Sequence, residues 1–430
     1  MRLKLSGGIF AASHLVVDMA CFSVLMGGFY RGVDGLAEVA AGFLLYNALA
    51  FALQLPLGFL ADKVRVAPSR WAVSGCLLVV VGLLFLVPPG ASPALCWVSL
   101  SLCALGNALF HIGGGIDSLV NAGGRFARSG VFISFGALGV ALGTLMGKSG
   151  FFWTPWVVLL LLAAVVVMRV YCWEDEVVVG GGGAGDGGGR GAAAARASGQ
   201  PGGGGIEAAG SRGAAAGGGA GAAAFSRSGA ITGLGEVVVV LCLASIVIRA
   251  LIGAYTPIPW RGDGWLFFLP ACFVFLGKFL GGWLADRWGA KATVGLSLLV
   301  AAPLLAFGNA NVALCCLGLF FFNVTTAVTL CVVAARLPKY PGVSFGLTTL
   351  ALFFGSSPGF FWVLPEGLRP VLTIAMVLGS LLCVVLVAPN KVRPGRAAAG
   401  GRGDGGGATE GRGDGGGGAT EGRSKIRLGL

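Results

Sequence analysis

Six of the polar side chains inside long apolar runs of the sequence are candidates for chemistry. They are His14, Asp18, Asn107, His111, Arg249 and Asn323. Ionisable or strongly polar groups within a hydrocarbon layer are rare, and they mark substrate, ion or proton pathways. Asp18 stands about ten residues into its apolar run, which is roughly 15 Å along a helix that rises 1.5 Å per residue. We therefore expect it near the middle of a membrane.

The spacing of four of these residues places them in pairs on helix faces. His14 precedes Asp18 by four residues, and Asn107 precedes His111 by the same interval. Residues four apart are neighbours on one face of a helix. A carboxylate beside an imidazole in a low-dielectric cavity can bind and release a proton, and the two groups titrate as a coupled unit. The other interpretation is a structural hydrogen bond that fixes helix packing, and the sequence leaves both open.

Arg249 is the strong base that lies deep in the second half of the chain. Because arginine keeps its charge, it needs an anion, which is Asp18, Glu236, or a substrate carboxylate or phosphate. Lys278 lies about one helical turn from a charged loop, and we expect its side chain to snorkel to the membrane interface. Asn323 offers neutral hydrogen bonds to a substrate.

Two short charged stretches separate apolar runs and read almost alike. The first is GFLADKVR, from Gly58 to Arg65, and the second is GGWLADRWGAK, from Gly281 to Lys291. Glycine lets two helices approach closely, and an aspartate at a helix end can pair with a base or face the positive amino end of another helix. Such contacts can hold one face of a protein shut. The candidate gating residues are Gly58, Asp62, Lys63, Gly282, Asp286, Arg287, Gly289 and Lys291.

The composition indicates a membrane protein. Of the 430 residues, 56% are hydrophobic and 11% are charged, and the mean hydropathy is +0.87. Soluble domains carry about 25% charged residues. Apolar runs near the roughly 20 residues that cross a hydrocarbon core recur along the chain, without the alternation of a membrane β-barrel. We predict an all-α polytopic protein in a lipid bilayer, most simply the plasma membrane.

Twelve spans fall into two sets of six. The predicted domains are a first bundle at 1–171, a linker at 172–230, a second bundle at 231–389 and a tail at 390–430. The linker is rich in Gly and Ala, and the tail is rich in Gly. Such segments cannot bury enough apolar surface to offset their ordering entropy. Most of the 30 Lys and Arg residues fall in the linker, the tail and alternate loops. This bias predicts that both termini are cytoplasmic.

The charged stretches occupy the same place in each half, after the second span and before the third. Parallel six-helix repeats are a known transporter plan. The pattern Gly-x-Leu-Ala-Asp-Arg/Lys-x-Gly-x-Lys/Arg resembles the signature loop of the major facilitator superfamily. The second copy matches throughout, whereas the first has Arg65 where glycine is expected. The resemblance implies two parallel six-helix bundles around a central cavity, with alternating access.

Three segments of the first half resemble a narrower group, the fosmidomycin-resistance branch of bacterial efflux proteins. They are SHLVVDMACFSVLM (Ser13 to Met26), ALFHIGGG (Ala108 to Gly115) and LGVALGTL (Leu138 to Leu145). Ile112 and Thr144 stand where that branch carries proline. The resemblance implies a subgroup of efflux proteins and does not imply a substrate.

Several other classes of protein lack support in the sequence. It shows no G-x-x-x-x-G-K-[ST] nucleotide loop, hydrolase elbow or metalloprotease motif, and its eleven cysteines show no zinc spacing. We expect no enzyme, metal, cofactor or nucleic-acid partner. The leading hypothesis is a monomeric secondary transporter that exports a small organic solute against proton entry. The alternatives are uptake or facilitated diffusion of an anionic solute, and a transporter-like sensor or scaffold that moves nothing.

Overall fold

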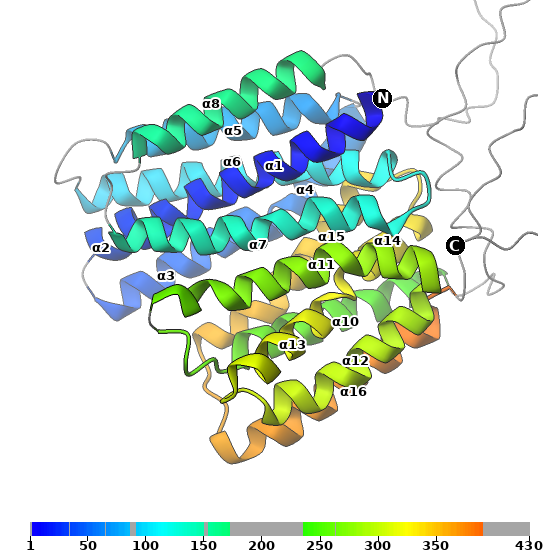
Figure 1. Cartoon of the computed structure of the whole chain (residues 1–430). Helices are drawn as coiled ribbons and strands as arrows, with labels where there is room; N and C mark the ends of the chain where they lie inside the picture. The colour runs from blue at the N-terminus through cyan, green and yellow to red at the C-terminus, as the bar shows by residue number, and fades with distance from the viewer. Residues whose placement is uncertain are drawn as a thin grey trace, which may run out of the picture. The chain divides into compact units, whose positions relative to one another are not determined.

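The computed structural model describes residues 2–33, 35–64, 66–86, 92–149, 154–172, 235–262 and 264–389. These residues form helices and turns, with no strand among them (Figure 1). Eleven helical segments are long and apolar enough to cross a membrane, and a shorter apolar helix, Pro68–Leu84, accompanies them. The predicted all-α fold class is confirmed, and the chain is a multi-pass integral membrane protein.

The first half contains six spanning segments. The first consists of α1 (Arg2–Ser23), a π-helical turn η1 (Val24–Phe29) and the short α2 (Tyr30–Gly32). The second consists of α3 (Leu36–Asn47), a π-helical turn η2 (Ala48–Ala52) and α4 (Gln54–Val64). The others are α5 (Pro68–Leu84), α6 (Pro93–Val120), α7 (Phe126–Ser149) and α8 (Thr154–Tyr171). Proline begins α5 and α6, where a missing N–H is tolerated.

The second half repeats this plan. Its first three spans are α10 (Gly235–Tyr255), α11 (Leu269–Trp288), which follows the 3₁₀ turn η4 (Gly264–Phe268), and α12 (Ala290–Phe307). The next span is divided into α13 (Val312–Asn323) and α14 (Thr326–Arg336). The last two are α15 (Pro341–Ser356), continued by η5 (Ser357–Phe360), and α16 (Arg369–Val387), preceded by η6 (Glu366–Leu368).

The break between α13 and α14 was not expected from the sequence. It falls at Val324 and Thr325, in a run of β-branched residues. The Thr325 hydroxyl donates to the Phe322 carbonyl at 3.1 Å, and the Thr326 hydroxyl donates to the Asn323 carbonyl at 2.9 Å. Such side-chain bonds to the preceding turn compete with the helical ladder. The result is irregular backbone in mid-span, which membrane proteins tolerate where protein covers it.

Buried apolar side chains form two clusters. One is built from the first-half helices, with Leu330 and Phe345 added from the second half. The other is built from α10 to α16, with Phe126 added from α7. Helices α7 and α11 pack side by side where the two sets meet, and α4 packs against α15 (Figure 1). Two bundles with separate cores agree with the predicted repeat.

The domain boundaries at 171 and 231 stay a prediction. Nearly all of the 172–230 linker and the whole 390–430 tail lie outside the described residues.

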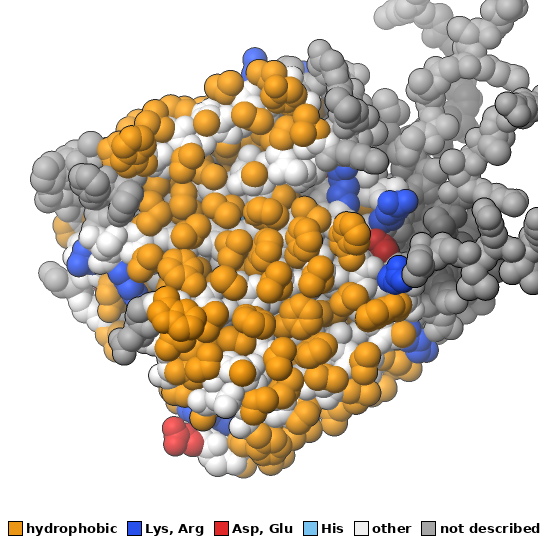
Figure 2. Space-filling view, in the orientation of Figure 1, with side chains coloured by type: hydrophobic (Ala, Val, Ile, Leu, Met, Phe, Trp, Pro, Cys, Tyr) orange, Lys and Arg blue, Asp and Glu red, His pale blue; other side chains and the backbone are white. Residues whose placement is uncertain are grey.

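The outer surface separates apolar from charged side chains. In Figure 2, hydrophobic side chains cover the middle of the visible face, and Lys, Arg and acidic side chains lie toward its two ends. Exposed apolar residues include Leu160 on α8, Val240 on α10 and Leu382 on α16. An apolar band with charged ends is the surface that a bilayer requires.

Candidate functional site

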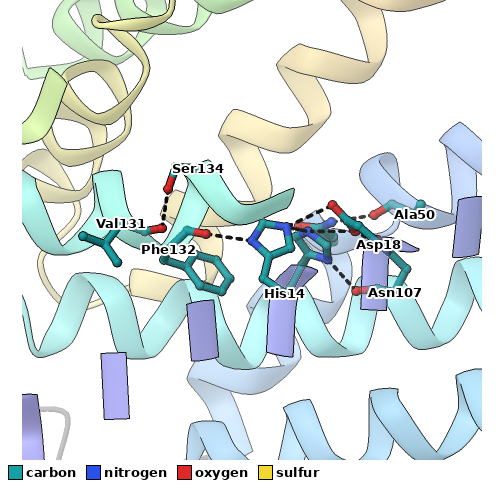
Figure 3. Close-up of polar contacts among 9 residues, drawn as sticks. His14, Asp18, Ala50, Asn107, Val131, Phe132 and Ser134 are labelled. Atoms are coloured by element: carbon teal, nitrogen blue, oxygen red, sulfur yellow. Dashed lines mark hydrogen bonds and ion pairs between the residues drawn. The ribbon is translucent and has the colours of Figure 1, made fainter. Parts of the chain in front are cut away.

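Four of the six predicted residues meet in one buried cluster between α1, α6 and α7 (Figure 3). His14 Nε2 lies 3.2 Å from Asp18 Oδ2, and Asn107 Nδ2 donates to Asp18 Oδ1 at 2.9 Å. His111 Nε2 lies 2.7 Å from His14 Nε2 and 3.8 Å from Asp18 Oδ1. The two pairs inferred from four-residue spacing therefore face each other, although they come from helices far apart in the sequence.

The carbonyl partners of the two imidazoles determine which nitrogens carry hydrogen. His14 Nδ1 lies 2.8 Å from the Phe132 carbonyl, and His111 Nδ1 lies 2.9 Å from the Asn107 carbonyl. Because a carbonyl oxygen only accepts, we assign a hydrogen to each Nδ1. In a neutral imidazole, Nε2 is then an acceptor. Two acceptors 2.7 Å apart repel each other unless one is protonated and donates to the other. The geometry fits a cluster that holds one extra proton, balanced by the Asp18 carboxylate.

The same three side chains are also of metal-ligand types. The ligand atoms of His14, Asp18 and His111 lie within 4.8 Å of one another. A tetrahedral zinc ion with nitrogen ligands at about 2.0–2.1 Å would hold two nitrogens roughly 3.3 Å apart. The 2.7 Å between the two Nε2 atoms is shorter, so it fits a shared proton better than a shared ion.

Gly136 of α7 makes room for the cluster. A Cβ atom at this position would lie 2.5 Å from His14 Nε2 and 2.6 Å from Asp18 Oδ2. Gly139 and Gly143, in the LGVALG segment, lie directly against the α1 backbone. Close packing of α7 on α1 is therefore part of the construction of the site.

Arg249 lies in α10 with 8% of its surface exposed. Its Nη2 donates to Thr326 Oγ1 at 2.8 Å and its Nη1 donates to Thr329 Oγ1 at 3.3 Å. Within the described part of the chain, no carboxylate lies within 4.0 Å of the guanidinium. Two of the three anions expected for it, Asp18 and Glu236, are therefore not its partners. Threonines beside the break in the tenth span hold it instead.

Asn323 does not join the cluster through any contact found among the described residues. Its Nδ2 donates to the Leu319 carbonyl of its own helix at 2.8 Å. A Cβ atom added to Gly277 of α11 would lie 3.0 Å from the Cβ of Asn323, so the two helices are in close contact there. It ends α13 and so marks the position of the break that orients Arg249.

The first charged stretch contacts the amino end of a helix in the other half. Asp62, at the end of α4, accepts hydrogen bonds from the backbone N–H groups of Gly342 and Val343, each at 2.8 Å. These N–H groups belong to the first turn of α15, where the helix has its positive end. Gly58 packs on Gly342 without side chains between them, and a Cβ on either residue would collide with the other backbone.

The second charged stretch makes the equivalent contact with α7. Asp286, near the end of α11, accepts from the N–H groups of Phe126 and Ala127 at 2.9 and 3.1 Å. A Cβ on Gly282 would lie 2.6 Å from the Phe126 carbonyl. Gly289 joins α11 to α12 with a φ of +93°, a left-handed conformation that glycine adopts readily. We call the end of the molecule that carries both contacts the motif end.

The basic residues of the two stretches do not pair with these aspartates. Lys63 and Arg287 are exposed, and neither forms an ion pair within the described residues. The Lys291 backbone N–H donates to the Pro389 carbonyl at 3.3 Å. Of the two partners considered for the aspartates, the helix amino end is therefore the observed one. Arg65, the departure from the pattern, lies outside the described residues.

Three solved structures are similar to this chain over nearly their whole length. One is the major facilitator superfamily transporter FucP in the outward conformation, with a TM-score of 0.60, 13% identity, and coverage of 90% of this chain and 98% of that chain. A point variant of the E. coli fucose:proton symporter FucP has a TM-score of 0.58 and 13% identity, with coverage of 90% of this chain and 98% of that chain. The human organic anion transporter MFSD10 has a TM-score of 0.57 and 15% identity, with coverage of 88% of this chain and 98% of that chain. The chain has the major facilitator superfamily fold. No protein-family model matches the sequence, and no curated protein matches it.

Within the major facilitator fold, Lys278 lies on α11 and is partly buried. Its neighbour Gly277 packs against the α13 backbone. No ion pair of Lys278 is found among the described residues, and its snorkelling to the interface stays a prediction.

Proposed function

We propose that the protein is a secondary transporter in which a proton bound at His14, His111 and Asp18 is coupled to the movement of a small organic solute. The observation that carries the proposal is the 2.7 Å approach of two Nε2 atoms whose Nδ1 partners are both carbonyls. Histidine is the side chain whose charge changes near neutral pH. The transporter fold supports the proposal but does not specify the coupled ion.

The alternation of access would use the two aspartate contacts at the motif end. Asp62 and Asp286 each join one half to the other through backbone N–H groups. With both contacts made, the two halves touch at this end. Their release would let the halves rock apart and expose the interior, including the proton cluster, to that side of the membrane.

The direction of transport stays a prediction. Export against proton entry, and the likeness to the fosmidomycin-resistance branch that suggests it, rest on the sequence segments alone. A monomer in the plasma membrane with no enzymatic activity is part of the same proposal.

The test uses proteoliposomes loaded with a pH-sensitive dye and a panel of radiolabelled organic solutes. We expect the wild-type protein to couple a pH gradient to the flux of at least one solute. Asp18→Asn and His111→Gln should reduce gradient-driven flux at least tenfold and should retain counterflow, the exchange of labelled for unlabelled solute without a gradient. Ser245→Ala is the matched control, because it removes a buried second-half hydroxyl that bonds to Ser380 at 2.7 Å and not to the cluster.

Retained counterflow shows that a variant is folded and still binds solute. Undiminished gradient-driven flux in both Asp18→Asn and His111→Gln would disprove the proton-coupling role. Absence of any flux in the wild-type protein across the panel would favour the sensor or scaffold hypothesis.

A further inference from the structure

Phe345 of α15 is a second-half side chain that lies in the apolar core of the first half. Its side chain is buried and belongs to the cluster built from the first-half helices. It packs on Gly115 of α6, where an added Cβ would lie 2.5 Å from the ring. Phe345 also follows Gly342 by three residues, and the Gly342 N–H donates to Asp62 at the motif end. The ring therefore joins the first-half core to the helical turn that makes this motif-end contact.

A second aromatic ring connects Phe345 to the proton cluster. The ring centroid of Phe132 on α7 lies 6.1 Å from that of Phe345 and 4.8 Å from that of the His14 imidazole. The planes of Phe132 and His14 are 29° apart, so these two rings stack. The Phe132 carbonyl also accepts from the His14 Nδ1–H at 2.8 Å (Figure 3). Phe132 thus holds His14 through its ring and through its backbone.

Two adjacent glycines of α6 leave room for both rings. An added Cβ on Gly114 would collide with the ring of Phe132, and one on Gly115 would collide with the ring of Phe345. Protein interiors are packed closely enough that the displacement of one side chain strains its neighbours. A movement of Phe345 is therefore transmitted to Phe132, and from Phe132 to the imidazole that it holds.

The equivalent position of the first half carries no such ring. Counted from the first N–H that each motif-end aspartate accepts, Phe345 corresponds to Ser129 of α7. Ser129 is buried, and its hydroxyl donates to the Ser118 carbonyl of its own half at 3.3 Å. The repeat therefore does not require an aromatic side chain here. The aromatic ring is on the helix whose motif-end contact lies with the half that contains the proton cluster.

We infer that Phe345 is a positioning residue that links closure of the motif end to proton binding by His14 and His111. This inference rests on the proposed transport function and concerns the control of the same site. While α15 lies against α4, Phe345 holds Phe132 in place. The Phe132 carbonyl then keeps the His14 Nδ1–H engaged, and His14 Nε2 stays 2.7 Å from His111 Nε2, where the two share a proton.

Opening of the motif end withdraws Phe345 with α15, and this orientation of His14 is lost. The closed state therefore binds the proton more tightly than the open state. By reciprocity the proton favours closure, and it is released when the interior opens to the motif-end side.

The linkage predicts the sign of a pH effect. The charged groups that face His14 are Asp18 of its own helix, at 3.2 Å, and His111 of α6, at 2.7 Å. From α7 it meets Phe132 and Gly136, which do not titrate. The imidazoles change charge between pH 5 and 8, so the motif end should open as the pH rises through this range. Protonation of the motif-end aspartates would open it as the pH falls, which is the opposite sign.

The test needs no solute, because the proton is the ligand. Spin labels are attached after Lys63→Cys and Lys339→Cys, two exposed positions beside α4 and α15, in the full-length protein in lipid nanodiscs. The partly exposed native cysteines are first replaced by alanine. We expect the ratio of open to closed molecules to rise about tenfold from pH 5 to pH 8. Phe345→Ala should reduce this rise to less than about twofold.

Three further variants separate the position of the ring from the stability of the fold. Phe345→Leu refills much of the space and should restore at least half of the pH effect. Gly115→Ala places a Cβ 2.5 Å from the ring and should lose the effect although the ring is still present. Phe29→Ala is the matched control, because it removes a fully buried ring of the same cluster that contacts Trp97 instead, at 4.7 Å. It should retain the wild-type pH effect.

The inference is overturned if the wild type shows no pH effect or one of opposite sign, if Phe345→Ala and Gly115→Ala respond as the wild type does, or if Phe29→Ala loses the effect equally. Each of these results leaves the proposed function standing, provided that Asp18→Asn and His111→Gln still lose gradient-driven flux. Undiminished flux in those two variants refutes proton coupling itself, and the inference then falls with it.

Discussion

Removing the charge of Asp62 or Asp286 should open the motif end. Each carboxylate accepts two backbone N–H groups across the halves, at 2.8 to 3.1 Å. Hydrogen bonds to a charged group contribute about 1.5–3 kcal/mol each, and both contacts are only part-buried, so the lower value applies. Asparagine keeps one acceptor oxygen and loses the charge and the second acceptor. We expect each Asp→Asn change to cost the closed state about 2 kcal/mol relative to the open state.

This difference corresponds to about a 30-fold change in the ratio of open to closed molecules, because 1.4 kcal/mol is tenfold. A protein that is open about 1% of the time would then be open about a quarter of the time. The two contacts share no residues, so their effects should be nearly additive. In the double variant Asp62→Asn/Asp286→Asn, the closed state should be destabilised relative to the open state by about 4 kcal/mol, which is enough to make the open state predominant.

The assay measures the distance between spin labels attached at the exposed residues Lys63 and Lys339, after substitution by cysteine. These residues flank the contact between α4 and α15. The partly exposed native cysteines, Cys172, Cys272 and Cys383, are first replaced by alanine. The long-distance population should grow from wild type to single to double variant.

A control variant separates the contact from a general effect of lost charge. Glu366→Gln removes an exposed acid that lies 3.7 Å from Arg369 and should leave the distance distribution unchanged. If the double variant gives the wild-type distribution, the carboxylates do not hold the motif end closed, and the proposed route of alternating access is wrong.

Two glycine substitutions give further predictions. Gly136→Ala places a Cβ 2.5 Å from His14 Nε2 and 2.6 Å from Asp18 Oδ2. This variant should therefore lower gradient-driven flux at least tenfold. A flux equal to that of the wild type would contradict the described packing. Gly289→Ala forces alanine into a φ of +93°, which costs about 1–2 kcal/mol, so its unfolding temperature should fall by several degrees. Gly295→Ala is the control for both, because a Cβ at Gly295 has nothing within 4 Å. Equal unfolding temperatures for Gly289→Ala and this control would refute the argument from the positive φ of Gly289.

Local periodicity predicted the parts of the site that lie on one helix. The four-residue spacing of His14 and Asp18 is sufficient to place them together, because helix geometry alone decides it. The repeated charged stretches likewise predicted a two-half fold, since a motif at equal positions implies equal topology. These predictions required no knowledge of how distant helices pack.

The remaining features depend on packing between helices. His14 and His111 are 97 positions apart, and their approach requires the absence of a side chain at Gly136, which no pattern in the sequence connects to them. The partners of Arg249 depend on the break before Thr326, which arises from competing hydroxyl bonds rather than from a proline or glycine.

The aspartate contacts at the motif end recognise backbone rather than side chains. Asp62 bonds to the N–H groups of Gly342 and Val343, and a different side chain at position 343 would leave its N–H in place. The acceptor side of the contact is thus fixed to aspartate, while position 343 on the donor side tolerates any residue except proline. Position 342 is restricted to glycine, because a Cβ there would collide with the Gly58 backbone. A protein built this way can change the side chains of Phe126, Ala127 and Val343 in the course of sequence divergence and still make these hydrogen bonds. For the same reason, only one partner of each contact is visible in the sequence as a motif.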